Sequence, residues 1–428
     1  MIQSSILSLI CFIGLIFPPL SHSLACSMCK ITIDGKTTVG NNEDMWSNEA
    51  KIWFEAGNGT SQGAVYVGHR NDFPQGGMNE SGLVYDGFTL HPKAMSSTRG
   101  KKAVDHPALL LKKVMQSCRN VAEVHAFLQA YNLSCFNSGM FWFIDKNGDH
   151  LIVESDTLIF RNEPHCALVN VRPSETEDWS KVTTPRYRKA MALLNSRQDS
   201  SMAFCASVMD AMKASRGELG DGTLYTSIYD TQEGIIDLYF YQDFEQSVRF
   251  HLQEELAKGD HFYDIASLFP PNAGYEKFLA YKTPFTSKAL FWLLAGSAIV
   301  VLLISGYYFV FLIRKLLKER MAFFASWQVY LLSFLLVTNF LLLVLIPLLL
   351  LMEPIYYFGM EGSIGNFPFK QVQYFPLLIG ICSLAALAFT IQVIKQRSGS
   401  VLHTSMLSIN SVILIINLGL CAYWNILL

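Results

Sequence analysis

The sequence predicts an α+β domain followed by an all-α membrane region of four helices, and two observations support this fold class. Between residues 26 and 281, stretches that alternate around glycine-containing turns and stretches of helical periodicity occur in separate groups. This grouping favours sheets covered by helices over a parallel βαβ series. After residue 288 the chain is almost continuously apolar in four long runs, each long enough to cross a bilayer as a helix.

Three segments of the first part predict β-hairpins. Each one alternates in polarity on both sides of a turn pair, at Asp34-Gly35, Asn147-Gly148 and Glu233-Gly234. Turn pairs that end in glycine are strong signals of a tight hairpin. We therefore expect strands directly before and after each pair.

Two pairs of helices are expected between these hairpins. Apolar residues recur at helical spacing from about Pro107 and again from about Val121. The segments 185–197 and 201–215 show the same spacing. The helices would cover the sheets that the hairpins form.

The first 25 residues have the pattern of an export signal. The apolar run from Ile6 to Leu20 is too short to span a bilayer comfortably. Ser23 and Ala25 are small residues at the −3 and −1 positions of a cut before Cys26. We expect residues 1–25 to be a signal peptide and residues 26–281 to form an exported domain; an uncleaved N-terminal anchor and a lipoprotein signal are the alternatives.

The membrane region follows a short linker at residues 282–288. Its predicted spans cover about 289–313, 327–352, 372–394 and 401–427. The first and third connecting loops are basic: they contain Arg314, Lys315, Lys318, Arg320, Lys395 and Arg397. Because basic loops remain in the cytoplasm, the preceding domain and the C-terminus are expected on the periplasmic or extracellular side. The partners of the spans would be membrane lipids, and a formal charge of −2 gives no reason to expect nucleic acid.

Cys26 acquires a particular chemistry if the signal is removed. Its thiol and a free α-amine then share one Cα atom, and an α-amine has a pKa of about 8, well below that of a lysine. The amine can therefore take the thiol proton at neutral pH, directly or through water, and activate the sulfur without a histidine. Cys26 is accordingly the candidate nucleophile.

The other cysteines carry less information. Cys29 has no such amine beside it, so we expect a buried strand residue or one half of a disulfide. The C-x-x-C spacing of Cys26 and Cys29 also occurs in redox motifs, but those lie between a strand and a helix, whereas this one opens a strand. Four further cysteines lie between the predicted cut and the spans, and their spacing does not fix any pairing: Cys118, Cys135, Cys166 and Cys205. The histidines are isolated, and we predict neither a metal site nor another cofactor.

Cys26 is followed by a hairpin and then by the segment "VGNNEDMW". This arrangement resembles the start of the choloylglycine hydrolase group of N-terminal-nucleophile amidases, which includes bile salt hydrolases, penicillin V acylases and, more distantly, acid amidases and acyltransferases of acyl amides. The group's Gly-Arg-Asn-x-Asp-Trp segment is matched at Gly40, Asn42 and Asp44. Further similar segments follow in order to about Asp243: "GGMNESGLVYDGF", "FWFIDKNGDHLIVES", "ALVNVRP", "TTPRYRKA" and "TLYTSIYDTQEGIIDLYFY".

The resemblance implies a four-layer αββα fold and a role for each matching residue. Cys26 corresponds to the nucleophile, and Asp44 to the residue that orients its α-ammonium group. Asn170 takes the place of an asparagine that offers its NH2 group to the oxyanion. Arg186 or Arg188 corresponds to an arginine that supports the centre electrostatically.

Two positions depart from the bile salt hydrolase pattern. Asn41 stands where those enzymes have an arginine, and Thr89 stands where they have an asparagine of the oxyanion hole. A threonine hydroxyl can still donate a hydrogen bond. The departures therefore bear on bile-salt specificity more than on the amidase chemistry.

Together these features predict a membrane-anchored hydrolase that acts on carbon–nitrogen bonds in linear amides. It would cleave small N-acyl compounds, including lipid-like ones, through a thioester on Cys26. Two alternatives remain open at this point. The same site could transfer the acyl group to an amine, or the exported part could be a non-catalytic ligand-binding or sensor domain on a four-span membrane module.

Overall fold

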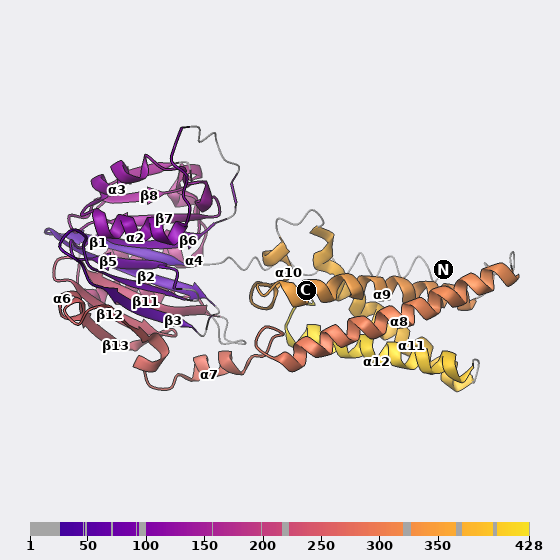
Figure 1. Ribbon diagram of the computed structural model, residues 1–428. Coiled ribbons are helices and arrows are strands. Elements are labelled where there is room, and N and C mark those ends of the chain that lie inside the picture. The colour runs from indigo at the N-terminus through magenta and orange to yellow at the C-terminus, as the bar shows by residue number, and fades with distance from the viewer. Residues whose placement is uncertain are drawn as a thin grey trace. The chain divides into compact units, whose positions relative to one another are not determined.

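The computed structural model describes residues 26–427, apart from 46, 48, 70–71, 91, 94–99, 156, 198, 216–221, 320–326, 365–369 and 397–399. Residue contacts divide the chain at residue 281 into two compact units (Figure 1). The first contains two sheets with short helices, and the second contains long helices. The predicted signal peptide, residues 1–25, lies outside the described residues.

The first sheet has six antiparallel strands in the order β10-β1-β2-β11-β12-β13. They are β1 (Ser27–Ile33), β2 (Lys36–Met45), β10 (His165–Val169), β11 (Gly222–Asp230), β12 (Ile235–Phe240) and β13 (Asp243–His251). The predicted hairpins at Asp34-Gly35 and Glu233-Gly234 are confirmed, because they join β1 to β2 and β11 to β12. The φ angles of Asp34 and Gly35 are 50° and 76°, as a two-residue type I′ turn requires.

The second sheet has eight antiparallel strands in the order β14-β3-β4-β5-β6-β7-β8-β9. They are β3 (Ala50–Glu55), β4 (Ala64–His69), β5 (Gly76–Asn79), β6 (Val84–Thr89), β7 (Gly139–Ile144), β8 (His150–Val153), β9 (Leu158–Arg161) and β14 (His261–Asp264). The predicted hairpin at Asn147-Gly148 is confirmed as the connection of β7 to β8. Gly148 has a φ of 88°, which only glycine adopts readily.

Each sheet carries a pair of helices on its outer face. Helices α2 (Pro107–Ser117) and α3 (Val121–Leu128) pack on the eight-stranded sheet (Figure 1). Helices α4 (Pro185–Ser196) and α5 (Met202–Met212) pack on the six-stranded sheet. Both predicted helix pairs are therefore confirmed. Two shorter helices complete this unit, α6 (Leu252–Leu256) and α7 (Ala273–Ala280).

The inner faces of the two sheets pack against each other. Along β1, Cys29 and Ile31 belong to the core beneath α4 and α5, whereas Met28 points to the opposite face and is equally buried. Thr37 of β2 donates a hydrogen bond of 3.0 Å to the carbonyl oxygen of Lys146 in the β7–β8 turn. The order helix, sheet, sheet, helix confirms the predicted α+β class and its four layers.

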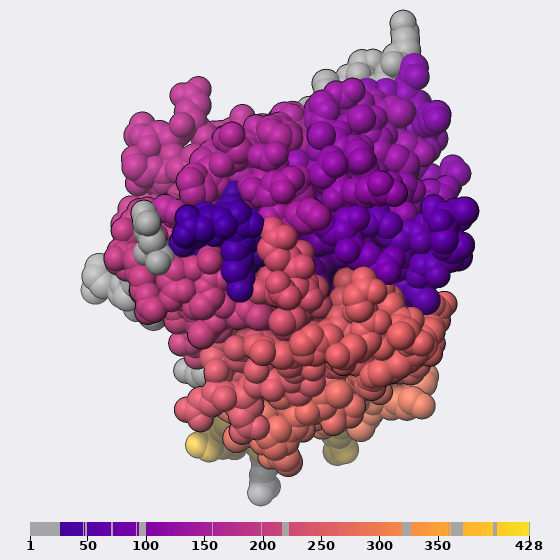
Figure 2. All heavy atoms as spheres, turned by 90° about the vertical axis from the view of Figure 1, so that its left-hand side faces the viewer, coloured from indigo at the N-terminus to yellow at the C-terminus, as the bar shows by residue number. Residues whose placement is uncertain are grey.

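The fold brings segments from distant parts of the sequence together. On the face that Figure 2 presents, indigo atoms from the start of the described chain lie beside magenta and coral atoms of segments that follow much later. The six-stranded sheet explains this arrangement, because its first hairpin inserts between β10 and β11.

At Gly40, helix α5 packs tightly against β2. A Cβ atom at this position would lie 2.6 to 2.9 Å from side-chain atoms of Met209 and Cys205, closer than real Cβ atoms come to their neighbours. Asn42, on the same face, donates to the carbonyl oxygen of Met209 at 2.9 Å and accepts from Thr226 at 2.6 Å. Gly40 and Asn42 of the "GNNED" segment therefore hold α5 against the six-stranded sheet.

Among its described residues, the second unit contains four helices that are long and apolar enough to cross a membrane. They are α8 (Lys288–Glu319), α9 (Trp327–Leu351), α11 (Phe375–Gln396) and α12 (Val401–Tyr423). Helix α8 contacts α9 and α12, and α11 contacts the same two helices. The four predicted spans are confirmed as helices, although the first extends further than expected and the last ends earlier. A short helix, α10 (Ile355–Ile364), follows α9.

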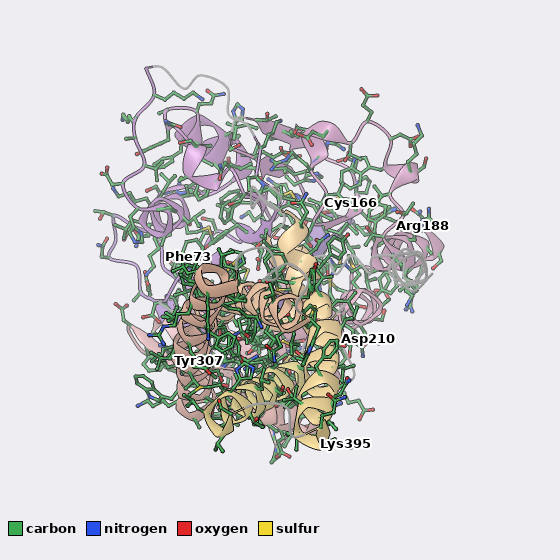
Figure 3. The ribbon with its side chains drawn as sticks, turned by 90° about the vertical axis from the view of Figure 1, so that its right-hand side faces the viewer. Phe73, Cys166, Arg188, Asp210, Tyr307 and Lys395 are labelled. Atoms are coloured by element: carbon green, nitrogen blue, oxygen red, sulfur yellow. The ribbon has the colours of Figure 1, made fainter. Side chains whose placement is uncertain are left out.

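Polar side chains link neighbouring helices inside this bundle. Asn339 of α9 donates to the hydroxyl of Ser305 on α8 at 3.0 Å. The hydroxyl groups of Thr390 and Ser411 lie 2.8 Å apart and join α11 to α12. Hydrogen bonds of this kind contribute to helix association in an apolar environment. Figure 3 shows Lys395 at the end of α11, where the apolar run gives way to a charged residue.

Candidate active site

Cys26 directly precedes β1, and strand register determines what lies opposite it on β2. The two-residue turn pairs Ser27 with Asn42. One position further from the turn, Cys26 therefore faces Glu43. The side-chain atoms bear this out, because Cys26 Sγ donates to Glu43 Oε2 at 3.4 Å.

On its other side β1 pairs with β10, which brings a second predicted residue to Cys26. Ser27 is the register partner of Val169, the last residue of β10. The next residue along each chain segment is Cys26 on one side and Asn170 on the other. The register thus places two residues that are far apart in the sequence at the same end of the sheet.

A continuous chain of hydrogen bonds joins three of the predicted site residues. Arg186, on α4, donates from Nη1 to Asp44 Oδ2 at 2.8 Å and from Nη2 to Asn170 Oδ1 at 3.1 Å. Asn170 in turn donates from Nδ2 to the backbone oxygen of Thr89 at 2.8 Å. Because the guanidinium group is planar and rigid, Arg186 fixes the orientation of the Asn170 amide relative to Asp44.

Asp44 is buried and is bound through both carboxylate oxygens. Thr223, on β11, donates to Oδ1 at 2.5 Å, and Arg186 occupies Oδ2. Burial raises the pKa of Asp44 to about 7, while the Arg186 guanidinium and the Thr223 hydroxyl lower it. Asp44 therefore titrates near neutral pH.

Glu43 is a residue of the site that the sequence reasoning missed. Its Oε2 atom accepts from Cys26, and its Oε1 atom lies 3.3 Å from Nε2 of His69 at the end of β4. The side chain of Glu43 is only 3% exposed. A signal for Glu43 was present in the sequence, because a two-residue turn at Asp34-Gly35 determines the register that sets it opposite Cys26.

The Cys26 thiol lies in an acidic environment. Burial raises its pKa well above the ordinary value, and the charges of Glu43, Asp44 and Asp86 raise it further. A hydrogen bond from the backbone of Asp44 has the opposite effect. The thiol is therefore protonated at neutral pH, and a reaction of the sulfur requires a base that removes this proton.

The remaining predicted residues lie in different surroundings. Arg188 is exposed, donates from Nε to the backbone oxygen of Val182 at 3.1 Å, and lies at the periphery of its unit (Figure 3). Asn41 is fully buried, and its amide atoms have no hydrogen-bond partner among the described residues. The side chain of Thr89 is exposed, and the described contact of this residue with the site is through its carbonyl oxygen.

The part of the chain that the structure describes contains no cluster of three or more His, Cys, Asp or Glu side chains suited to a metal ion. A surface hollow of about 540 Å³ lies beside the loop 56–62 and the C-terminal end of α2, and none of the candidate residues lines it. The hydrogen-bonded group around Cys26 is therefore the candidate site.

Several solved structures are similar to this chain, and two of them are the following. One is penicillin V acylase from Agrobacterium tumefaciens, with 13% sequence identity and a TM-score of 0.47 over 56% of this chain and 91% of that chain. The other is a mutant of the conjugated bile acid hydrolase from Clostridium perfringens, with 16% identity and a TM-score of 0.43 over 58% of this chain and 97% of that chain. No protein-family model and no curated protein sequence matches this chain.

Proposed function

We propose that this protein is a membrane-anchored cysteine hydrolase of linear amides. The observation that carries the proposal is the placement of Cys26 beside Asn170 and Glu43 in the strand register, with Arg186 bridging Asn170 to Asp44. A nucleophile, an amide donor and a fixed orientation of that donor are what acyl transfer chemistry requires.

The proposed reaction begins after removal of residues 1–25, which leaves the α-amine of Cys26 free. The thiol proton moves to this amine, and the sulfur attacks the carbonyl carbon of the amide. The Asn170 NH2 group donates to the oxyanion of the tetrahedral intermediate. The C–N bond then breaks, the leaving amine takes the proton from the α-ammonium, and water hydrolyses the Cys26 thioester.

The proposed location is the outer face of a membrane. The basic residues of the first and third loops support this orientation. The four apolar helices would hold the hydrolase domain at the bilayer, where N-acyl compounds with long acyl chains accumulate. We therefore propose N-acyl amides with an apolar acyl group as the substrate class.

The experiment that tests this function compares cysteine variants of the full-length protein in detergent. Its mature N-terminus is first identified by mass spectrometry. Hydrolysis is then followed on a series of N-acyl amides of increasing acyl length. We expect Cys26→Ala and Cys26→Ser to abolish hydrolysis and Cys29→Ala to retain it.

Two outcomes would contradict the proposal. Retained activity in Cys26→Ala would exclude the nucleophile, and an intact signal or a modified Cys26 amine in the active protein would exclude the base. Adding a primary amine to the assay separates hydrolysis from acyl transfer, because transfer produces a new amide instead of the free acid.

A further inference from the structure

Two adjacent carboxylates of β2 lie near Cys26, and they differ in what they contact. Asp44 receives hydrogen bonds from Thr223 and Arg186 on its two oxygens. Glu43 accepts from the Cys26 thiol itself. Adjacent strand residues point to opposite faces of a sheet, so the two acids have separate surroundings. Of the two, Glu43 is the one whose side chain contacts the sulfur.

The strand register and neighbouring side chains fix the contact between Glu43 and Cys26. The turn at Asp34-Gly35 sets the strand register, and Tyr225 of β11 pairs with Glu43 across the next strand. The second oxygen of Glu43 is bound to His69 of the other sheet. The titratable groups that face Cys26, directly or through Glu43, are Glu43, Asp44, His69, Asp86 and Tyr225.

We propose that Glu43 is the positioning residue of the nucleophile: it holds the Cys26 thiol by a hydrogen bond and, once the thiol proton has moved, it is the counter-ion of the α-ammonium group. The proposal rests on the proposed function for its catalytic consequence. Its first part, the hold on the thiol, stands on the 3.4 Å contact alone.

The proton transfer that this role involves takes place within one residue, Cys26. The S–H bond of Cys26 breaks, and an N–H bond forms on its own α-amine. A neutral pair thereby becomes a thiolate and an ammonium, with no change in net charge. The adjacent negative charge of Glu43 favours the ammonium and disfavours the thiolate. Glu43 would thus keep the thiol protonated at rest and would stabilise the base after the proton has been transferred.

Glu43→Gln tests this role, because glutamine keeps the shape and an acceptor oxygen but removes the charge. Without the charge, the thiol ionises more readily and the ammonium lacks its counter-ion. In the mature full-length protein, we expect the pH profile of Cys26 alkylation by iodoacetamide to shift down by about one pH unit. Alkylation at pH 7 would then be about tenfold faster, while kcat/KM for amide hydrolysis would fall about tenfold. A loss of structure would also speed alkylation, because it exposes the buried thiol, so the comparison is made on a variant whose thermal unfolding matches that of the wild type.

Asp237→Asn is the matched control. It removes another buried carboxylate of the same sheet, which is bound to Arg249 and is not among the charges that act on Cys26. We expect its alkylation profile to equal that of the wild type, and thermal unfolding of both variants shows whether they are folded. An unchanged or upward-shifted profile in Glu43→Gln would overturn the electrostatic effect of Glu43 on the thiol. Faster alkylation with unchanged kcat/KM in Glu43→Gln would overturn the counter-ion role. A wild-type Cys26 that iodoacetamide does not alkylate at any pH would overturn it as well.

The link between His69 and Glu43 is tested with His69→Gln in two backgrounds. If His69 acts through Glu43, it changes the alkylation rate of Cys26 in the wild type and has no further effect in Glu43→Gln. Equal effects in both backgrounds, or none in either, would overturn this link. The alkylation measurements need no substrate. They remain decisive for Glu43 even if Cys26→Ala retains hydrolysis and the proposed function fails.

Discussion

Arg186 Nη1 lies 2.8 Å from Asp44 Oδ2, although 142 positions separate these residues in the sequence. The contact joins the outer helix α4 to the end of strand β2, and the second nitrogen of the same guanidinium reaches Asn170. One side chain thereby ties the helical layer to the end of the sheet where Cys26 lies.

Arg186→Gln is expected to lower kcat/KM for amide hydrolysis about 100-fold, because the Asn170 amide loses the group that orients it. Arg186→Lys should recover little, since a single ammonium cannot bridge two acceptors with fixed geometry. Arg188→Gln is the control on the same helix: its described contact is with a backbone oxygen away from the site. Equal losses in the two glutamine variants would show that Arg186 has no special role.

Asn170→Ala is expected to lower kcat between about 100-fold and 1000-fold with little change in KM, as the loss of an oxyanion donor does. Asn195→Ala removes an exposed asparagine of α4 that contacts His165, and it should leave both constants near the wild-type values. Steady-state kinetics on one N-acyl amide suffice. A change confined to KM in Asn170→Ala would assign Asn170 to substrate binding instead.

Asp44 makes the stability of the fold depend on pH. Its pKa is about 7 in the folded chain and about 4 in an unfolded one, so between these values the folded state binds more protons and stability falls as pH rises. The contribution lost between pH 5 and pH 7.5 is on the order of 2.5 kcal/mol. Thermal unfolding of the detergent-solubilised protein should therefore show a smaller decline from pH 5 to pH 7.5 in Asp44→Asn than in the wild type. Parallel declines would exclude this titration.

Cys29 and Cys205 are positioned to form a disulfide between β1 and α5. Their sulfur atoms lie 3.5 Å apart, and both side chains are fully buried. A disulfide needs about 2 Å between the sulfurs, so a small movement would suffice in an oxidising compartment. Peptide mapping of the unreduced, exported protein should find the two residues linked, with Cys205→Ala releasing Cys29 as a free thiol. Alkylation of both thiols after denaturation without a reductant would show that the pair stays reduced.

Native Cys135 provides a test of membrane orientation, because it is exposed in the first unit. A membrane-impermeant maleimide should label it in intact cells, and Cys135→Ala should lose that label. In the Cys135→Ala background, a cysteine introduced by the substitution Lys395→Cys at the end of α11 should react only after permeabilisation. Labelling of this second site in intact cells would reverse the proposed orientation.

The sequence was sufficient to predict those parts of the fold that depend on local pattern. Turn pairs such as Asp34-Gly35 set positive φ angles, and Pro107 and Val121 begin helices at the expected residues. The apolar runs of bilayer length form helices, because an apolar segment has few other ways to satisfy the hydrogen bonds of its backbone. These features depend on neighbours along the chain.

The candidate site was predictable only in part. Arg186 and Arg188 lie on one helix two positions apart, and nothing local distinguishes them; packing of α4 on the sheet turns Arg186 toward Asp44 and leaves Arg188 exposed. Glu43 follows from the hairpin register, whereas the motif marks only its neighbour Asp44. His69 belongs to the other sheet, and only the packing of the two sheets brings it to Glu43.

The turn at Asp34-Gly35 has a consequence for how this chain can vary. In every pair across a two-residue turn, the two residues are the same number of positions away from the turn. The lengths of the two arms, from Gly35 to Glu43 and from Asp34 back to Cys26, therefore determine that Cys26 lies opposite Glu43. A single inserted or deleted residue in either arm would set a different side chain opposite the sulfur and on the wrong face. If the proposed cut before Cys26 is correct, the cleavage position determines which residue carries the free α-amine, and the hairpin length determines which residue lies opposite Glu43. Both must select Cys26. Loop insertions should therefore be tolerated at many places in this domain before they are tolerated here.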